Sequence, residues 1–449
     1  MHSSFNKEAE LLSREQLIIL GLLGSKGIAS SAELQSATGK SQATVSRLIA
    51  GLSSQVLTLG RARATLYGLP KSIHQLPAQQ PIFWTDEAGR MDRIGTLSLL
   101  AGDVVHVESD RASGITTGTL PWFLSPLRAQ GFLGRLLARR LESAGVDPNP
   151  ERWGLESVLF AALQLHDAPG AVTIGEPDDG LAHSALPSSD AKLPVALEAL
   201  ARDVALTLPA GSSAGGEQPK FLARFERGAH VLVKFTPPRS TPFGERWHDL
   251  LHAEALASSV LRAHGAAVAS TRLVHGESRT FLLSESFDRV GARGRRHAVP
   301  IGAVHEAFVP GRYEHWAASC ESLARQRRLP SEDAAAAASL LRFGRLIGNT
   351  DMHSGNLSLF VRPEDLSRGR FRLAPVYDML PMRWRPDPAA GQAQDYAPFA
   401  IAPANADSPA DAPARAFWDL LSREQGVSRG LRRVAREMAA RLSSSRRRA

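Results

Sequence analysis

The residue types best suited to chemistry cluster in residues 349–360, which hold Asp351, His353 and Asn356 in one tight turn. An apolar strand is expected directly after this turn, and a second strand is expected to end at Asp378. Phosphoryl transfer requires one carboxylate to orient the acceptor hydroxyl. It also requires an Asn and a second carboxylate to hold Mg²⁺ against nucleotide phosphates. The spacing therefore predicts Asp351 as a catalytic base and Asn356 and Asp378 as Mg²⁺ ligands of an ATP-dependent kinase.

A kinase site also needs a loop over the phosphates and a lysine that reaches them. Residues 211–220 are rich in Gly and Ser, so their backbone amides could approach phosphates closely. Lys234 lies in an apolar strand expected over 230–235, where a lysine without a partner is unusual. Glu254, on a helix expected over 249–262, is its natural partner, and this pairing is the protein-kinase arrangement. The sequence leaves open two alternatives: residues 211–220 could be an ordinary surface turn, and Lys234 and Glu254 could be two separate solvated charges.

Residues 280–289 predict a hinge between two lobes. They form an apolar strand that breaks into polar residues, and backbone between Glu285 and Phe287 would meet the adenine of ATP. Arg289 is expected to brace the structure and not to touch substrate.

Residues 10–70 predict a DNA-binding winged helix. Three short helices, the last over 42–52, are followed by strands expected over 56–59 and 65–68. Short polar residues and one arginine on the outer face of the last helix are the types that read base edges, and arginines in the wing are suited to phosphates. The alternative is a helical interaction module that does not bind DNA. The residues expected to contact DNA are Gln42, Thr44, Ser46, Arg47, Arg61 and Arg63.

Composition restricts the class of protein. The 449 residues carry a net charge of +8 and a single cysteine, Cys320, which excludes an internal disulfide and fits a reducing compartment. Residues 1–75 contain eight Lys or Arg against four Glu, and residues 426–449 contain eight Arg against one Glu, so a polyanionic partner is expected. No apolar run is long enough to span a membrane and no signal sequence is evident, so a cytoplasmic protein is expected. Motifs typical of zinc enzymes or acyl transfer are missing from the sequence.

The expected fold class is α+β, with a winged helix-turn-helix in front of a two-lobed kinase-like body whose C-lobe is mostly helical. Residues 81–180 mix short strands and helices and show no motif that predicts chemistry. The expected domains are 1–72 (winged helix), 80–190 (additional subdomain), 191–300 (N-lobe with the Gly-rich loop) and 301–449 (helical C-lobe).

Four motifs, in this order, resemble the HipA family of serine/threonine kinases, the toxins of bacterial toxin–antitoxin pairs. Ser213–Lys220 resembles the S-x-x-G-x-Q-x-K loop of that family, and Ser284–Arg289 resembles its E-R-F-D-R segment with Ser286 in place of the first Arg. Asn349–Asn356 contains T-D-x-H-x-x-N, and Leu373–Asp378 is L-x-P-x-Y-D. The resemblance covers roughly residues 85–400.

The resemblance implies ATP and Mg²⁺ as cofactors, with His353 supporting the catalytic loop. It also implies that Ser213 is autophosphorylated, with Ser212 as an adjacent alternative, and that the added charge displaces the loop and switches the kinase off. The residues expected to contact nucleotide are Ser213, Gly215, Gly216, Lys220, Lys234, Glu254, Glu285 and Phe287.

The sequence departs from the family pattern in two places. Pro381 stands where family members often have Ser, and the fused N-terminal segment resembles the HipH/YjjJ-type variant of the family. The fusion leaves open whether a separate antitoxin exists. The sequence also leaves open a transcription regulator whose kinase-like body only binds nucleotide, a metal-dependent nuclease and a kinase of small molecules. The protein substrate is not indicated.

Overall fold

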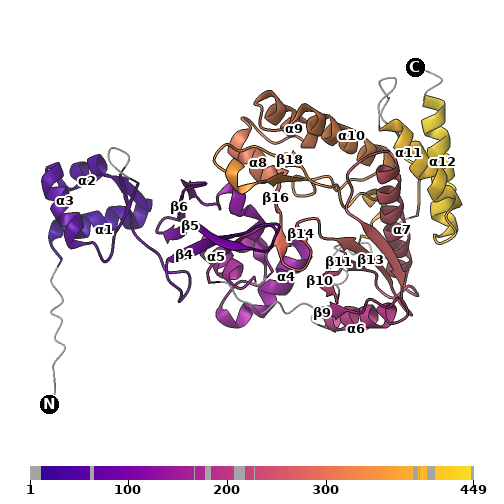
Figure 1. Ribbon diagram of the computed structural model, residues 1–449, viewed down its shortest axis with the longest axis horizontal. Coiled ribbons are helices and arrows are strands. Elements are labelled where there is room, and N and C mark those ends of the chain that lie inside the picture. The colour runs from indigo at the N-terminus through magenta and orange to yellow at the C-terminus, as the bar shows by residue number, and fades with distance from the viewer. Residues whose placement is uncertain are drawn as a thin grey trace, which may run out of the picture.

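The computed structural model describes residues 12–60, 65–165, 167–176, 184–206, 218–226, 228–387, 393, 395–401 and 410–445. The N-terminal unit lies at one end of the molecule, and the remaining elements form a larger body beside it (Figure 1). The fold is a mixed α+β fold, with helices packed against several separate sheets.

The N-terminal unit consists of three helices and a three-stranded sheet in the order β1-β3-β2. Serines begin two of the helices, because Ser13 and Ser30 each form a capping box with the residue three positions later. The strand β1 was not expected from the sequence, since it is only three residues long and has no clear alternation. The elements are α1 (Arg14–Lys26), β1 (Ile28–Ser30), α2 (Ser31–Thr38), α3 (Gln42–Gly51), β2 (Leu57–Leu59) and β3 (Leu66–Gly68).

A small apolar cluster joins the N-terminal unit to the next sheet. Buried Leu59 packs with buried Leu100 and Val104, and the side chains of Ile28 and Leu66 complete the cluster. The amide of Ala101 also donates to the carbonyl of Leu69 at 2.8 Å. The N-terminal unit is therefore packed against the body and not merely tethered to it.

The middle of the chain forms a five-stranded antiparallel sheet in the order β7-β6-β5-β4-β8. Its buried face packs on short helices through residues such as Leu97, Val105 and Leu159. The elements are β4 (Gln79–Thr85), β5 (Met91–Leu100), β6 (Val104–Ser109), β7 (Gly114–Thr117), η2 (Trp122–Leu127), α4 (Gly131–Arg140), η3 (Glu142–Ala144), η4 (Pro150–Arg152), α5 (Leu155–Leu163) and β8 (Val172–Ile174).

A second five-stranded sheet, in the order β12-β13-β11-β10-β9, carries Lys220 and Lys234 on neighbouring strands. Strand β9 already belongs to this sheet, so the boundary expected near residue 190 lies too late in the chain. The long helix α7 begins at Pro242, seven residues before the expected start, because Thr241 caps it and Pro is favourable in a first helical turn. The elements are β9 (Ser184–Leu186), α6 (Leu193–Leu206), β10 (Lys220–Phe225), β11 (His230–Phe235), α7 (Pro242–Ala263), β12 (Thr271–His275) and β13 (Thr280–Glu285).

The C-terminal part is mostly helical around a three-stranded sheet in the order β16-β17-β18. Because β16 pairs with β17, the boundary expected at residue 300 divides this sheet. The strand expected over 371–376 is shorter in the structure, since Pro375 has no N–H to donate to a ladder. The elements are β14 (Arg289–Val290), β15 (Gly294–Arg295), β16 (His297–Pro300), α8 (Ile301–Phe308), α9 (Trp316–Arg325), α10 (Ser331–Ile347), β17 (Ser358–Val361), η6 (Pro363–Asp365), β18 (Arg372–Leu373), η7 (Met382–Trp384), α11 (Asp411–Arg423) and α12 (Arg429–Ser445).

Candidate active site

One cavity of about 670 Å³ brings together six of the residues that the sequence predicted to form the site. It lies where β10, β11 and the turn of residues 349–356 (named the catalytic turn for its predicted role) meet, and its lining also includes residues of the middle of the chain, around α4 and η4. No motif in that middle region predicted a part in the chemistry. The predicted residues in the lining are Lys220, Lys234, Asp351, His353, Asn356 and Asp378. The unexpected polar residues are Arg128, Gln130, Arg135, Asn149, Glu151, Gln218 and Arg385.

A buried lysine connects the two halves of the cavity. Lys234 Nζ lies 2.6 Å from Glu254 Oε1, and it also donates to Asp378 Oδ1. Burial alone would lower the pKa of Lys234, but the carboxylates of Asp378 and Glu254 raise it above its ordinary value. Lys234 is therefore a permanent cation in the centre of the site.

The two carboxyl groups that bind Lys234, those of Glu254 and Asp378, have pKa values shifted in opposite directions. Burial raises the pKa of Glu254 in spite of its contact with Lys234. Burial would also raise the pKa of Asp378, but Lys234 and Lys220 hold it below its ordinary value. Asp378 is thus the carboxyl group that the lysines keep ionised, as a metal ligand must be.

The catalytic turn is held by hydrogen bonds of its asparagines. Asn349 Oδ1 accepts from the amide of Asp351 at 3.0 Å, and Asn349 Nδ2 donates to the carbonyl of Asp378 at 3.1 Å. Asn356 Nδ2 donates to the carbonyl of Asp351 at 2.7 Å. Because Nδ2 of Asn356 is engaged, its Oδ1 remains as an acceptor, the atom that an amide offers to a metal.

Side-chain and backbone contacts of His353 stabilise the same turn. His353 Nδ1 accepts from the amide of Gly355 at 2.9 Å, and the His353 carbonyl accepts from Trp316 Nε1 at 2.8 Å. The hydroxyl of Tyr377 donates to the carbonyl of Gly355 at 2.9 Å. The turn is therefore fastened to α9 and to the segment that carries Asp378.

Asp378 has an unusual backbone conformation. Its φ is +55°, in the left-handed region that residues other than glycine rarely occupy. The carbonyl of the same residue accepts the hydrogen bond from Asn349 Nδ2, which helps to hold this conformation. Strained residues of this kind concentrate at functional sites, where the surrounding contacts hold them in place.

The donor set fits both a divalent cation and a phosphorylated nucleotide. Oxygen ligands are available from Asn356 and Asp378, which is the chemistry that Mg²⁺ prefers. Lys220 and Lys234 lie directly opposite each other on β10 and β11. Gln218 also lines the cavity, and among the described atoms its Nε2 is buried without a hydrogen-bond partner, as a donor for a phosphate oxygen would be.

The structure does not bring every predicted nucleotide residue into this cavity. Ser212, Ser213, Gly215 and Gly216 lie outside the described residues. Glu254, Glu285 and Phe287 are not part of the cavity lining among the described residues, and Glu254 pairs with Lys234 instead.

The hinge segment is occupied by contacts within the protein. The amide of Glu285 donates to the carbonyl of Ser270 at 2.8 Å, and the ring of Phe287 stacks on Tyr377 with centroids 5.5 Å apart. Arg289 braces the structure as expected, because it binds Asp167 Oδ1 at 2.8 Å.

The residues predicted to face DNA are displayed on α3. Gln42, Ser46 and Arg47 are exposed and Thr44 is half-buried, whereas Val45 and Ile49 of the same helix are buried. Arg61 and Arg63 lie outside the described residues.

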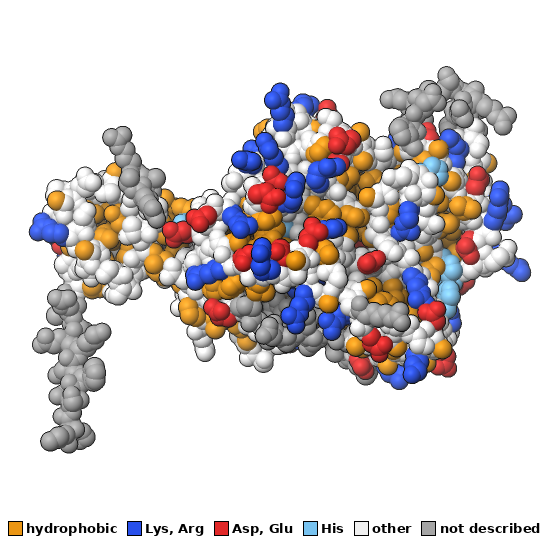
Figure 2. All heavy atoms as spheres, viewed as in Figure 1, with side chains coloured by type: hydrophobic (Ala, Val, Ile, Leu, Met, Phe, Trp, Pro, Cys, Tyr) orange, Lys and Arg blue, Asp and Glu red, His pale blue; other side chains and the backbone are white. Residues whose placement is uncertain are grey.

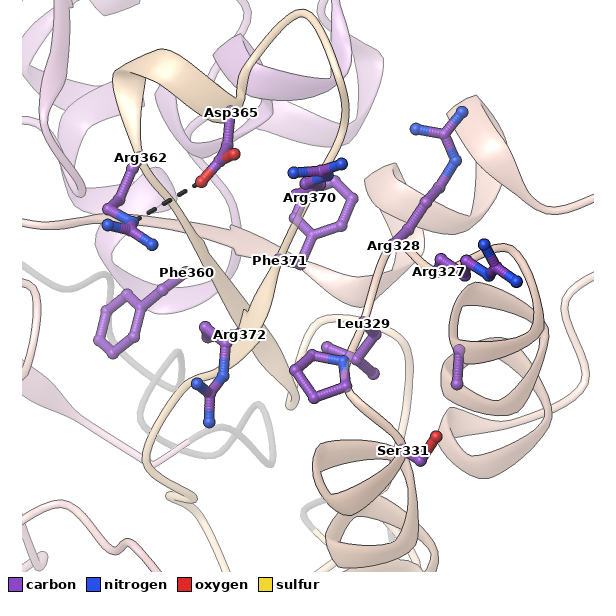
Figure 3. Close-up of a pocket in the computed structure, with 12 residues that line it drawn as sticks. Arg327, Arg328, Leu329, Ser331, Phe360, Arg362, Asp365, Arg370, Phe371 and Arg372 are labelled. Atoms are coloured by element: carbon purple, nitrogen blue, oxygen red, sulfur yellow. Dashed lines mark ion pairs between the residues drawn. The ribbon is translucent and has the colours of Figure 1, made fainter.

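A second hollow, of about 490 Å³, lies away from the catalytic turn and contains none of the predicted site residues. Figure 3 shows five arginines around it, contributed by the α9–α10 connection and the β17–β18 hairpin. Acidic side chains neutralise part of this charge, since Arg362 lies 3.6 Å from Asp365 and Arg372 lies 2.8 Å from Asp333. Positive and negative side chains also alternate over the visible face of the body in Figure 2.

Comparisons with known proteins identify the family of this chain. Residues 212–445 match the family described as HipA-like C-terminal domain, and residues 76–179 match the YjjJ-like toxin middle domain. The chain is 36% identical to Toxin YjjJ of Escherichia coli K12 over 431 residues, covering 92% of this chain and 94% of that protein.

The chain belongs to the HipA/YjjJ toxin family.

The family match over 212–445 contains all the catalytic and metal residues predicted above. The YjjJ-like match over 76–179 coincides with the sheet β4–β8 and the helices around it, which contribute Arg128 and Arg135 to the cavity. In this member of the HipA/YjjJ family the wall of the cavity is therefore built from both matched regions.

Two solved structures are similar at lower sequence identity. One is the complex of HipA, HipB and operator DNA from the toxin–antitoxin system of Shewanella oneidensis MR-1. It has a TM-score of 0.49 and 17% identity, covering 82% of this chain and 97% of that chain. Another is the proinflammatory kinase CtkA of Helicobacter pylori, with a TM-score of 0.35 and 11% identity, covering 52% of this chain and 95% of that chain. Within the part of the chain that the structure describes, none of the helices is both long and apolar enough to cross a membrane.

Proposed function

We propose that this HipA/YjjJ family member is an ATP- and Mg²⁺-dependent serine/threonine protein kinase. The observation that carries the proposal is the joint placement of Lys234, Asp351, Asn356 and Asp378 in one cavity, with Glu254 bound to Lys234 at 2.6 Å. A lysine fixed by a helix glutamate, a catalytic aspartate, and an Asn and Asp for metal are the parts that phosphoryl transfer uses.

The residues that line the cavity divide the tasks of the transfer among them. Lys234, Lys220 and Gln218 bind phosphate oxygens, while Asn356 and Asp378 would hold Mg²⁺, which neutralises phosphate charge when bound. The acceptor hydroxyl oxygen forms a bond to the γ-phosphorus of ATP while the bond between that phosphorus and the β–γ bridging oxygen breaks. ADP leaves, and the carboxylate of Asp351 takes the proton of the hydroxyl.

The same reaction on the Gly-rich loop would give the enzyme an off-switch. Ser213 is the expected acceptor and Ser212 the alternative. A phosphoryl group adds about −2 charge, which would repel the phosphates of ATP from the loop. This part of the proposal rests on the family motif at Ser213–Lys220, since Ser212 and Ser213 lie outside the described residues.

Incubation of purified protein with Mg²⁺ and γ-labelled ATP tests the proposal. Wild type, Asp351→Ala, Ser213→Ala and Ser212→Ala would be compared, with the labelled residues identified by mass spectrometry. Label on Ser213 or Ser212 in wild type and none in Asp351→Ala is the expected result. Bound nucleotide without any transfer would favour the second candidate function, a regulator whose kinase-like body only binds nucleotide.

The N-terminal unit supports a second role, that of a DNA-binding winged helix. The exposed residues Gln42, Ser46 and Arg47 on α3, followed by the pairing of β2 with β3, have the arrangement of a recognition helix and a wing. We infer that residues 1–72 bind an operator and that the cytoplasmic kinase acts on a protein substrate. A separate antitoxin is compatible with this role.

A further inference from the structure

Three histidines from α7 and β12 meet outside the lining of the catalytic cavity. His248 and His252 lie one turn apart on α7, and His275 is the last residue of β12. Each offers a ring nitrogen, and these nitrogens all lie within 4.8 Å of one another. Two histidines at positions i and i+4 of a helix, with a third ligand from a neighbouring element, are an arrangement typical of metal sites.

His252 is the central member of the group. His252 is only 8% exposed, and its Nε2 has no hydrogen-bond partner among the described atoms. A buried polar atom of this kind costs free energy unless a ligand satisfies it. The ring of His252 stacks on His275 and lies against His248, with centroids 5.3 Å and 4.6 Å away.

His248 is already oriented by two hydrogen bonds. Its Nδ1 lies 2.7 Å from Thr280 Oγ1 and its Nε2 lies 2.6 Å from the carbonyl of Gly426. Thr280 stands directly opposite His275 in the pairing of β12 with β13. The bond from Nε2 to the backbone carbonyl fixes the ring and its tautomer, as is usual for a metal-ligating histidine. It leaves Nδ1 as the atom that binds a metal, in place of the Thr280 hydroxyl.

The backbone makes room for the cluster at Gly426, in the connection between α11 and α12. A Cβ atom at this position would lie 2.4 Å from His252 Cε1, so only glycine allows the chain to approach so closely. At the edge of the molecule where α7 and α12 lie, histidine side chains reach the surface (Figure 2), which leaves a path for an ion.

The charges around the cluster permit a cation. The carboxylates of Glu424 and Asp249 interact electrostatically with His252, whereas the guanidinium of Arg239 interacts electrostatically with His275. The guanidinium of Arg239 is engaged by the carbonyls of Gly276 and Glu277 at 3.1 and 2.9 Å. Carboxylates therefore lie near the ring whose Nε2 has no partner among the described atoms, and the nearby guanidinium is held by backbone carbonyls.

We propose that His248, His252 and His275 bind one divalent transition-metal ion, such as Zn²⁺, which joins α7 to β12. Imidazole nitrogens select ions of this class over Mg²⁺, which prefers oxygen ligands. Helix α7 also carries Glu254, the partner of Lys234, so the ion fixes the helix that positions this pair. The site is independent of the proposed phosphoryl transfer.

Cobalt titration of the untagged full-length protein tests the site. The protein is first stripped with a chelator and then titrated with Co²⁺ in excess Mg²⁺, while the visible ligand-field absorption is recorded. Wild type is expected to bind one Co²⁺ per chain, and Zn²⁺ is expected to displace it and to raise Tm. His275→Ala and His252→Ala are expected to bind at least about tenfold more weakly.

Two controls separate this site from other sources of binding. His264→Ala removes an exposed histidine at the end of the same helix and should bind like wild type. Asp378→Asn removes the acidic ligand of the catalytic cavity and should also keep the absorption. His275 is exposed, so its variant should fold even where His252→Ala does not. Full Co²⁺ binding by His275→Ala, loss of it in Asp378→Asn, or no stoichiometric binding by wild type would overturn the proposal.

Discussion

Lys234 Nζ and Glu254 Oε1 lie 2.6 Å apart, and both side chains are only 3% exposed. This pair joins β11 to α7, while the second bond of Lys234, to Asp378, joins β11 to the C-terminal part of the chain. Three segments that are distant in sequence therefore meet at one buried ammonium group.

Loss of this cation is expected to destabilise the protein as well as to inactivate it. Lys234→Met leaves two carboxyl groups, Glu254 and Asp378, close together without their counter-ion. We expect the free energy of unfolding to fall by about 3–5 kcal/mol, measured by urea denaturation. Glu254→Gln is the matched variant: it keeps a hydrogen-bond acceptor for Lys234, so the loss should be about 1–3 kcal/mol. Equal losses in the two variants would contradict the central role of the ammonium group.

The middle of the chain is expected to contribute to nucleotide or substrate binding through Arg128. This residue lines the cavity together with Asp351 and Asn356. Arg128→Ala should raise the KM for ATP or for a protein substrate by about 10- to 100-fold, since one charge-assisted hydrogen bond contributes about 1.5–3 kcal/mol. Arg140→Ala, an exposed change at the end of α4, should leave both KM values unchanged.

The expected pH dependence of stability comes from His297, which is buried between β16, η2 and the start of β8. Its Nε2 donates to the carbonyl of Phe123 at 2.7 Å, and its Nδ1 accepts from the amide of Ala171 at 3.1 Å. Burial lowers its pKa from 6.5 to about 4. The unfolded chain therefore binds more protons between these values, and stability falls as the pH is lowered from 6.5 to about 4.

The contribution of His297 over this window is about 3 kcal/mol, at about 1.4 kcal/mol for each pKa unit. His297→Gln keeps one donor and one acceptor but does not titrate, so its unfolding free energy should depend less on pH between 4 and 6.5. Part of the slope should remain, because His252 also has a pKa lowered to about 4. An unchanged slope in His297→Gln would exclude His297 as a source.

DNA binding is expected to depend on Arg47 and Arg61 and not on the catalytic turn. The double variant Arg47→Ala with Arg61→Ala should weaken binding to operator DNA. It should also reduce the slope of log K against log salt by about 1 for each phosphate that the protein no longer binds. Phosphoryl transfer should be unaffected. Titration of labelled DNA at several salt concentrations measures both quantities, and an unchanged affinity would exclude α3 and the adjoining loop as the DNA-binding surface.

The sequence predicted the turn at residues 349–356 because the contacts that hold it are local. Asp351, His353 and Asn356 are close in the chain, and the bond from Asn356 Nδ2 to the Asp351 carbonyl spans only five residues. The pairing of Lys234 with Glu254 was also expected, since a buried strand lysine needs a partner and α7 offers an acid. Cys320, which has no partner motif in the sequence, is buried in α9.

Other features depend on tertiary structure and could not be predicted. Arg135 lies on α4 and reaches the cavity because α4 packs beside β10, and no spacing in residues 81–180 indicates that. The histidine cluster combines α7 with β12, which begins eight residues after the end of the helix, and only the packing brings their faces together. Strand β1 is formed by pairing with β3, not by its own sequence pattern.

The most direct test of the proposed kinase function is phosphoryl transfer by Asp351→Asn, a change that keeps the size of the side chain and removes the base. With Mg²⁺ and γ-labelled ATP, we expect the rate of label transfer to fall by about 10²-fold or more, while nucleotide binding and the thermal unfolding transition stay as in wild type. Asp419→Asn, an exposed change on α11, should transfer label at the wild-type rate. Transfer by Asp351→Asn at the wild-type rate would contradict the assignment of this cavity as a kinase active site.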